Sequence, residues 1–314
     1  MIIWDVLKAN VCIRYVSSII ETTLTKINIS TTMSSMRRSR ITITLDNLIL
    51  KKVDNLIDKN KIRNRSHAIE YILNQYTESN VHKAVILAGG RGTQLRPYTY
   101  ELPKPMLPVQ GTPILEHLIL QLKKHNVTEI IIAISYLGEK IKTYFGNGEK
   151  WGVHIRYSEE DDNLMTGGAL RKVKDKLGND TFLVIHGDIL TDFAFSDFID
   201  FHQKQEDTIA TVALTTLTEP HEYGQFKLHG TKLVQFYPNT QEPGIQSHLI
   251  HCGIYAFNPE IFNYFPKHKK QFALEDVLQE LVKKRQVNGF VFEGKWYDVG
   301  NPENYERAIK EYKI

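Results

Sequence analysis

From residue 83 onward, short apolar segments rich in valine and isoleucine alternate with segments of helical period. The segments with the character of strands are residues 83–87, 129–135, 154–157, 181–185 and 209–214. Between the first two, one face of a predicted helix carries Ile114, Leu115, Leu118, Ile119 and Leu122. Such alternation is typical of a mainly parallel sheet covered by helices, with a ligand crevice at the carboxyl ends of the strands. We therefore expect an α/β domain over residues 83–314.

The first predicted strand runs directly into a glycine-rich loop, which reads A-G-G-R-G-T-Q-L-R-P at residues 88–97. Glycines let a backbone approach a phosphate chain closely and direct N–H groups towards it. The loop lacks the Gly-Lys-Ser/Thr ending of a Walker loop, and Leu95 stands where a dinucleotide-binding fingerprint would place another glycine. The segment therefore indicates a phosphate-binding loop of another kind.

This loop resembles that of the sugar-1-phosphate nucleotidyltransferases, G-G-x-G-T-R-L-x-P, which is followed in the family by P-K-P-x-x-P. Here the second element reads P-K-P-M-L-P at residues 103–108. Matching motifs continue as T-G-G-A-L at 166–170, H-G-D at 186–188, Y-G at 223–224, C-G-I-Y at 252–255, L-E-D-V at 274–277 and W-Y-D-V-G-N-P-E at 296–303. The resemblance spans nearly everything from Lys83 onward, and it implies a Rossmann-like nucleotidyltransferase domain with a mainly parallel mixed sheet.

The resemblance also implies a reaction and a set of residues. A sugar 1-phosphate attacks the α-phosphorus of a nucleoside triphosphate, which gives an NDP-sugar and pyrophosphate; mannose-1-phosphate guanylyltransferases resemble the chain most, while thymidylyl and uridylyl transfer stay open. The implied catalytic residues are Lys104, which contacts the triphosphate, and Asp188 and Asp298, which hold Mg²⁺. The implied nucleotide-binding residues are Leu87, Gly89, Gly90, Gly92, Thr93, Gln94, Gly167 and Gly168. Gly224 and Trp296 are expected to help form the sugar pocket.

The chain departs from the family pattern at several positions. Gln94 stands in place of the usual loop arginine, and Arg91 or Arg96 could supply the positive charge that is missing there. Met165 replaces a glycine, and His186 stands where asparagine is common. The family's Glu-Lys-Pro element, whose lysine contacts the sugar phosphate, has no counterpart, because residues 233–247 contain neither lysine nor arginine. The remaining candidates for that contact are Lys227, His248 and His251.

The N-terminal part carries most of the positive charge. Residues 36–82 have a formal net charge of +4, whereas the whole chain has +3. Residues 40–45 alternate in polarity like a short strand, Asp46 can cap a helix that ends near Lys61, and Ser66 can cap a second helix. Strand, helix, turn and helix in about forty residues resemble the ribbon-helix-helix family of DNA-binding modules, in which two chains pair their strands.

That resemblance implies a homodimer or a larger homo-oligomer, and it implies duplex DNA as a partner. The DNA-contacting residues would be Arg40, Thr42, Thr44, Arg65 and Ser66. A dimerisation module with a merely solvated basic face is the alternative. The whole chain could then be an enzyme, a transcriptional regulator whose weakened transferase domain senses a nucleotide or nucleotide sugar, or both.

The expected organisation is a disordered extension over residues 1–35, the ribbon-helix-helix domain over 36–79, a linker at 80–82 and the transferase domain over 83–314. A true start codon at Met33 or Met36 is an alternative for the extension. Cys12 and Cys252 belong to no Cys/His cluster, which favours a reducing, cytoplasmic setting without a zinc site. No uninterrupted apolar run reaches the ~18 residues of a membrane span.

Overall fold

The computed structural model of the chain describes residues 43–58, 62–77, 81–160, 164–220, 222–238 and 246–313. The chain divides into two units, residues 1–65 and 66–314. The expected DNA-contacting residues Arg40 and Thr42 lie outside the described residues, as does the extension over residues 1–35. None of the helices in the described part is long and apolar enough to cross a membrane.

The N-terminal segment contains a short capped helix, α2 (Asn47–Asp54). The backbone N–H of Leu48 donates to the Asp46 carboxylate at 2.7 Å, which confirms the expected cap. The helix ends at Asp54 rather than near Lys61. Residues 43–45 form no strand, and a ribbon of this kind requires a second chain, so the ribbon-helix-helix module stays a prediction. The next helix, α3 (Arg65–Thr77), follows in the chain.

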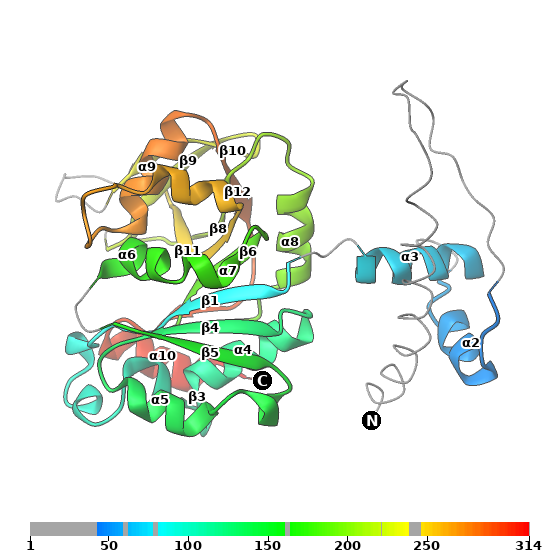
Figure 1. The fold of residues 1–314 in the computed structure, drawn as a ribbon, viewed down its shortest axis with the longest axis horizontal. Helices are drawn as coiled ribbons and strands as arrows, with labels where there is room; N and C mark the ends of the chain where they lie inside the picture. Colours follow the sequence, from blue (N-terminus) through cyan, green and yellow to red (C-terminus); the bar gives the residue numbers. More distant parts are fainter. Residues whose placement is uncertain are drawn as a thin grey trace. The chain divides into compact units, whose positions relative to one another are not determined.

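A nine-stranded sheet forms the centre of the second unit, in the order β5-β4-β1-β6-β11-β8-β12-β10-β9 (Figure 1). Its strands are β1 (Lys83–Leu87), β4 (Glu129–Ile134), β5 (His154–Glu159), β6 (Phe182–His186), β8 (Ala210–Thr216), β9 (Gln225–His229), β10 (Lys232–Tyr237), β11 (Leu249–Phe257) and β12 (Val287–Val291). The five expected strands are all present, with ends that shift by one or two residues.

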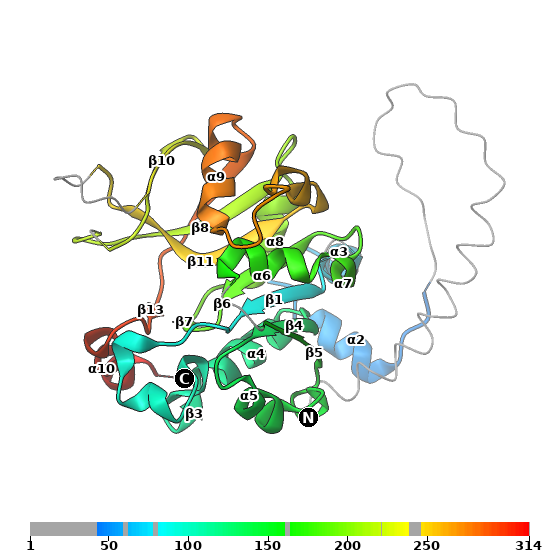
Figure 2. The same ribbon diagram turned by 60° about the vertical axis from the view of Figure 1, so that its left-hand side comes forward.

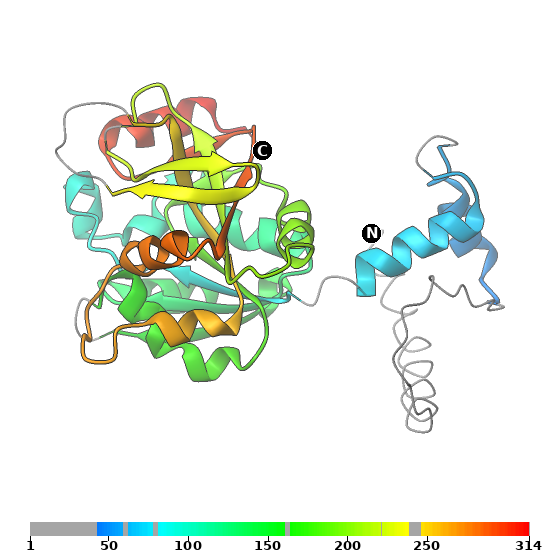
Figure 3. The ribbon, with the colours of Figure 1, turned by 90° about the horizontal axis from the view of Figure 1, so that it is seen from above.

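The sheet is more evenly mixed than the strand–helix alternation predicts. β5, β4, β1 and β6 run parallel, but β11 is antiparallel to both β6 and β8. β9 and β10, drawn in yellow, are also antiparallel neighbours (Figure 3), because Gly230 and Thr231 connect them directly and leave no room for a crossover. The strands from β5 to β6 therefore follow the expectation, whereas the other strands form antiparallel pairs beside the parallel pair of β8 and β12.

Helices cover both faces of the sheet. They are α4 (Ile114–Lys124), α5 (Gly138–Phe145), α6 (Met165–Lys172), α7 (Lys174–Leu177), α8 (Phe195–Gln203), α9 (Leu274–Lys283) and α10 (Pro302–Glu311). Successive strand residues point to opposite faces, so Ala84 and Ile86 pack with residues of α4 and α5, whereas Val85 packs with residues of α6 and α9. Every one of these three β1 side chains is buried, which anchors the loop that follows β1.

A third, smaller apolar cluster links the glycine-rich region to the end of the chain. It joins Leu95 and Leu107 to Tyr297 and Tyr305. The Tyr305 hydroxyl donates to the carbonyl oxygen of Pro108 at 2.8 Å, so α10 lies beside the segment that follows β1 (Figure 2). Two short ribbons complete the fold: β2 (Pro108–Val109) with β3 (Thr112–Pro113), and β7 (Ile189–Thr191) with β13 (Trp296–Asp298).

Candidate active site

The glycine-rich loop begins where β1 ends, at the carboxyl edge of the parallel strands. Gly92 adopts a φ of +59°, and a Cβ there would lie 2.9 Å from Thr99 Cγ2 and 3.2 Å from Lys104 Cβ. The Thr99 hydroxyl donates to the carbonyl oxygen of Gly92 at 2.7 Å, which holds this turn closed. Gly92 therefore provides the tight turn that brings Lys104 against the loop.

A cavity of about 280 Å³ opens beside this loop. Its wall includes Leu87, Gly89, Gly90, Arg91, Lys104, Ser135, Glu160, Thr166, His186 and Asp188. Of the predicted nucleotide-binding residues, Leu87, Gly89 and Gly90 line this cavity, whereas Gly92 shapes the turn and Thr93 and Gln94 are exposed outside the lining. Arg91 lines it too, while the Arg96 guanidinium lies over the Tyr100 ring at 5.0 Å. Of the two loop arginines, Arg91 is thus the one that borders this cavity.

The three predicted catalytic side chains come together from distant parts of the sequence. Lys104 and Asp188 form an ion pair, with both side chains mostly buried. Asp188 follows β6 and precedes β7, and Asp298 ends β13. Because β7 and β13 pair and Asp298 stands opposite Ile189, the two aspartates are brought to neighbouring positions. The backbone N–H of Val299 donates to the carbonyl oxygen of Asp188 at 3.0 Å, which fixes this approach.

These groups perturb one another strongly. Burial, reinforced by the charge of Asp188, raises the pKa of Asp298 to about 6. Burial alone would also disfavour the ionised form of Asp188, but Lys104 and His186 outweigh it and hold the pKa of Asp188 below its ordinary value. Burial likewise opposes the charge of Lys104, yet Asp188 and Asp298 keep the pKa of Lys104 above its ordinary value. The site is therefore a buried place where two carboxylates and one ammonium compensate each other's charge.

The two carboxylates have the character of a site for a hard cation. Asp188 Oδ1 is buried and has no hydrogen-bond partner among the described residues, so it retains an unused acceptor. The repulsion between Asp188 and Asp298 would be relieved by a cation between them. No group of three or more ligating side chains occurs among the described residues. Mg²⁺ commonly binds through one or two carboxylates plus substrate phosphates, and the donors present fit that pattern.

A second cavity, of about 320 Å³, is bordered by Asp298, whereas the first is bordered by Asp188. It is lined by His186, Ile189, Glu222, Tyr223, Gly224, Phe236, Pro238, His251, Gly253, Glu275, Trp296 and Asp298. Both predicted sugar-pocket residues are here: Trp296 donates from Nε1 to the Cys252 carbonyl oxygen at 2.9 Å, and a Cβ on Gly224 would lie 2.5 Å from Phe236 Cε2. The candidates Lys227 and His248 are exposed and do not line the cavity, whereas His251 does.

The glycine pair in α6 serves a contact that the sequence does not reveal. A Cβ on Gly167 would collide with the Phe272 ring, and one on Gly168 would lie 2.5 Å from the Lys270 carbonyl oxygen. The backbone N–H of Gly167 donates to the Phe272 carbonyl oxygen at 3.0 Å. These glycines let the start of α6 approach the segment before α9, and their neighbour Thr166 faces the nucleotide-side cavity instead.

The predicted DNA-contacting residues that the structure describes are Thr44, Arg65 and Ser66. Thr44 and Ser66 are exposed, and Ser66 lies inside α3 rather than at its cap. The Arg65 guanidinium makes two hydrogen bonds to the Asp54 carboxylate, at 2.6 and 2.8 Å. Arg65 therefore already has an anionic partner within its own unit.

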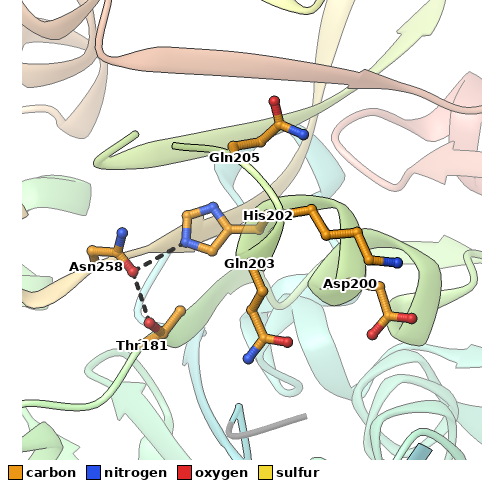
Figure 4. A pocket seen from close by; sticks show the side chains of 7 residues that line it. Thr181, Asp200, His202, Gln203, Gln205 and Asn258 are labelled. Carbon is orange, nitrogen blue, oxygen red and sulfur yellow. Dashed lines mark hydrogen bonds between the residues drawn. The ribbon is translucent and has the colours of Figure 1, made fainter. Parts of the chain in front are cut away.

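A cavity of about 400 Å³ lies against α8, away from the predicted residues. Figure 4 shows His202, Asn258 and Thr181 joined by hydrogen bonds in its wall. His202 Nδ1 also bonds the Thr211 hydroxyl at 2.6 Å, and burial lowers the pKa of His202 to about 4. The histidine is thus neutral and has a partner at each ring nitrogen, which is the pattern of a structural network.

Several residues of the two cavities were not predicted from the sequence. Tyr223 hydrogen-bonds Asp298, and Glu275 accepts from the Thr166 hydroxyl at 3.2 Å. Ser135 and Glu160 lie at the ends of the next parallel strands. The rule that ligands bind beyond the carboxyl ends of parallel strands could have found Ser135 and Glu160. Tyr223 and Glu275 stand inside matched motifs, but their side chains gave no separate signal.

Residues 83–313 match the family model described as nucleotidyl transferase. A mannose-1-phosphate guanylyltransferase of Mycobacterium tuberculosis is 32% identical over 228 residues, which cover 72% of this chain and 63% of that protein. The D-glycero-alpha-D-manno-heptose 1-phosphate guanylyltransferase of Campylobacter jejuni is 34% identical over 71% of this chain and 96% of its own. A UTP–glucose-1-phosphate uridylyltransferase of Synechocystis is 32% identical over 73% of this chain and 62% of its own. The chain thus matches less than two thirds of the first and third of these proteins.

Solved structures of nucleotidyltransferase-like proteins are also similar to this chain. A putative glucose-1-phosphate thymidylyltransferase from Bacillus anthracis, crystallised with sucrose, superposes with a TM-score of 0.68 at 26% identity and covers 74% of this chain and 96% of its own. HddC from Yersinia pseudotuberculosis, complexed with GMP-PN, superposes with a TM-score of 0.62 at 25% identity over 74% of this chain and all of its own.

Proposed function

The chain belongs to the nucleotidyl transferase family, and we propose that it transfers a nucleoside monophosphate from a nucleoside triphosphate to a sugar 1-phosphate. The observation that carries the proposal is the meeting of Lys104, Asp188 and Asp298 between two cavities. One cavity is bordered by the glycine-rich loop and the other by Tyr223, Gly224 and Trp296. Two polyanions can therefore meet where buried charges of both signs are already in place.

In this reaction a phosphate oxygen of the sugar 1-phosphate forms a bond to the α-phosphorus, and the bond from the α-phosphorus to the bridging oxygen of pyrophosphate breaks. The glycine-rich loop presents backbone N–H groups to the triphosphate, and Lys104 neutralises its charge. Asp188 and Asp298 would hold Mg²⁺. When bound, the ion supplies charge neutralisation to the phosphates. Tyr223 orients the Asp298 carboxylate through its hydrogen bond.

For the base and sugar we propose guanylyl transfer to a manno-configured sugar 1-phosphate. Two of the relatives are guanylyltransferases by name, and one of the similar structures contains GMP-PN. Relatives named for uridylyl and thymidylyl transfer are similarly close, so all three bases belong in the test.

The test is a panel of triphosphates and sugar 1-phosphates, with GTP, UTP, dTTP, CTP and ATP against mannose, glucose and manno-heptose 1-phosphates. Pyrophosphate release is measured with Mg²⁺ and again with EDTA. We expect turnover with at least one pair, fastest with GTP and mannose 1-phosphate, and its loss with EDTA. Failure of every pair with a folded protein would contradict the proposal.

A second proposal concerns residues 36–79, which we propose bind duplex DNA as a dimer. The net charge of +4 over residues 36–82 and the exposed Thr44 support it. We expect a salt-dependent mobility shift of duplex DNA that Arg40→Ala abolishes. Dimerisation of the full chain without any DNA shift would leave the module as a dimerisation element only.

A further inference from the structure

The sugar-side cavity lacks the charge that its proposed ligand requires. Its described lining contains Glu222, Glu275 and Asp298 but no lysine or arginine. Residues 233–247, where the family lysine would stand, also contain neither residue type. A sugar 1-phosphate carries a phosphate that must lie close to Asp188 and Asp298 to reach the α-phosphorus. Apart from Lys104, which pairs with Asp188, the donors for that phosphate must therefore be groups other than lysine or arginine.

His186 occupies the place where such a donor is needed. It ends β6, two residues before Asp188, and it is the residue common to the described linings of both cavities. Its Nε2 atom is buried and has no hydrogen-bond partner among the described residues. A buried ring nitrogen without a partner is unfavourable, and a ligand that supplies the partner explains why it is retained.

The position of the ring is set by β11. Gly253, at a φ of +70°, lies in the irregular stretch of β11 between His251 and Tyr255. A Cβ there would lie 3.0 Å from His186 Cγ and 3.1 Å from its Nδ1. The Cγ–Nδ1 side of the ring therefore lies against the β11 backbone, and the buried Nε2, which has no hydrogen-bond partner among the described residues, is at the far end of the ring.

His251 completes this wall of the cavity. Its ring lies 6.1 Å from that of His186, edge to face. The fully buried Tyr255 hydroxyl lies 3.0 Å from His251 Nδ1, and donating its proton there satisfies both groups. In that arrangement the proton of the His251 ring is on Nε2. His251 is thus a second hydrogen-bond donor beside His186 in a cavity whose described acidic residues are Glu222, Glu275 and Asp298.

We propose that His186 Nε2 binds the phosphate of the sugar 1-phosphate and takes the place of the lysine that this cavity lacks, with His251 beside it as a further donor. This inference rests on the proposed function, because it assigns a residue to one of that reaction's two substrates. It predicts that loss of Nε2 weakens the binding of the sugar 1-phosphate and leaves the binding of the nucleotide unchanged.

The test compares His186→Asn with His186→Gln in the full chain. The asparagine amide reaches the position of Nδ1, whereas the glutamine amide reaches that of Nε2. We expect His186→Asn to raise the KM for the sugar 1-phosphate about tenfold to a hundredfold, the effect of losing one hydrogen bond to a charged group. The KM for the triphosphate should stay within about twofold, and His186→Gln should restore most of the loss. The exposed histidine of β9 gives the matched control, His229→Asn.

Binding of α-mannose 1-phosphate and α-glucose 1-phosphate, each against the free sugar, is measured by calorimetry without nucleotide. We expect the phosphate-dependent heat to disappear in His186→Asn and to persist in His186→Gln and His229→Asn. Equal sugar 1-phosphate binding in His186→Asn and the wild type would overturn the inference while leaving the proposed function intact. Equal losses of sugar 1-phosphate binding in His186→Asn and His186→Gln, with the KM values for both substrates raised, would show a structural role for His186. This result would also overturn the inference. Neither binding nor turnover in the wild type would overturn both proposals.

Discussion

At the scale of single residues, the candidate site depends on charges that compensate one another in a buried place. Lys104 and Asp188 are already paired, while Asp298 has a pKa raised to about 6 by burial and by Asp188. Removing one carboxylate changes the net charge of this buried site, because one ammonium and one carboxylate then remain. Such groups are therefore expected to affect activity far more than they affect folding.

Asp188→Asn and Asp298→Asn should each lower kcat/KM by about a hundredfold or more, because either change removes a charged ligand from the proposed cation site. The concentration of Mg²⁺ at half-maximal activity should rise in both variants. Asp175→Asn, at an exposed position of the short helix α7, is the control and should match the wild type. Activity of either site variant equal to the wild type would argue against a catalytic cation held by that residue.

Gly253→Ala should disturb the site through the His186 ring. An alanine there combines an unfavourable φ of +70° with a Cβ 3.0 Å from Cγ of His186. We expect a loss of about 2 kcal/mol in the free energy of unfolding, and a raised KM for the sugar 1-phosphate.

Gly230→Ala is the matched control for that change, because its φ is +60° and its added Cβ would meet nothing within 4 Å. It should lose only about 1 kcal/mol, measured by urea unfolding, and should keep the wild-type KM. Equal effects of the two substitutions on the KM would mean that contact with His186 is irrelevant.

Met165 shows a departure from the family pattern with a structural consequence. It adopts a φ of +59°, which explains why glycine is usual at this position. Met165→Gly should therefore raise the free energy of unfolding by about 1 kcal/mol. Asn126→Gly, at a φ of +62°, should gain less because asparagine tolerates this conformation, and urea unfolding of both variants decides the comparison.

At the scale of elements, α8 is attached to the sheet by a buried polar network. His202 in α8 contacts Thr211 in β8 and Asn258 after β11 through its two ring nitrogens (Figure 4). Because burial holds the pKa of His202 at about 4, the folded protein resists a proton that the unfolded chain accepts below its ordinary pKa of 6.5. Acid should therefore lower the free energy of unfolding through His202, whereas an exposed histidine with the same pKa in both states contributes nothing to this dependence.

The free energy of unfolding is expected to fall as the pH decreases from about 6.5 to about 4, with at most about 3 kcal/mol due to His202. The sign follows from the lowered folded pKa: the unfolded state binds more protons throughout this window. His202→Gln should reduce the difference between the free energies of unfolding at pH 7 and pH 5, measured by urea unfolding. The difference that remains is due to His251, because burial also lowers the pKa of His251 to about 4. The control, the exposed His154→Gln in β5, should keep the wild-type slope; an unchanged slope in His202→Gln would refute the assignment.

At the scale of the whole molecule, the described core of the transferase domain draws on residues from Val81 onward. The family match begins at residue 83. A fragment of residues 81–314 should therefore fold with the thermal midpoint of the full chain's transferase domain, within a few degrees.

This fragment should also retain the kcat/KM of the full chain for the substrate pair that the panel identifies. Any dimerisation of residues 36–79 should be lost with them, which sedimentation of both proteins would reveal. A fragment that folds but is inactive would show that the N-terminal segment contributes to the site.

The sequence by itself determined the α/β class and the glycine-rich loop, because local periodicity and short motifs carry that information. Its resemblance to the family also gave Lys104, Asp188 and Asp298 as candidate catalytic residues. Only the tertiary structure decided how β11 enters the sheet antiparallel, why Gly167 and Gly168 face the Phe272 segment, and that Tyr223 supports Asp298. It also placed His186 between the two cavities with a free Nε2. These features depend on contacts between segments that are far apart in the sequence, and no local pattern encodes which segments meet.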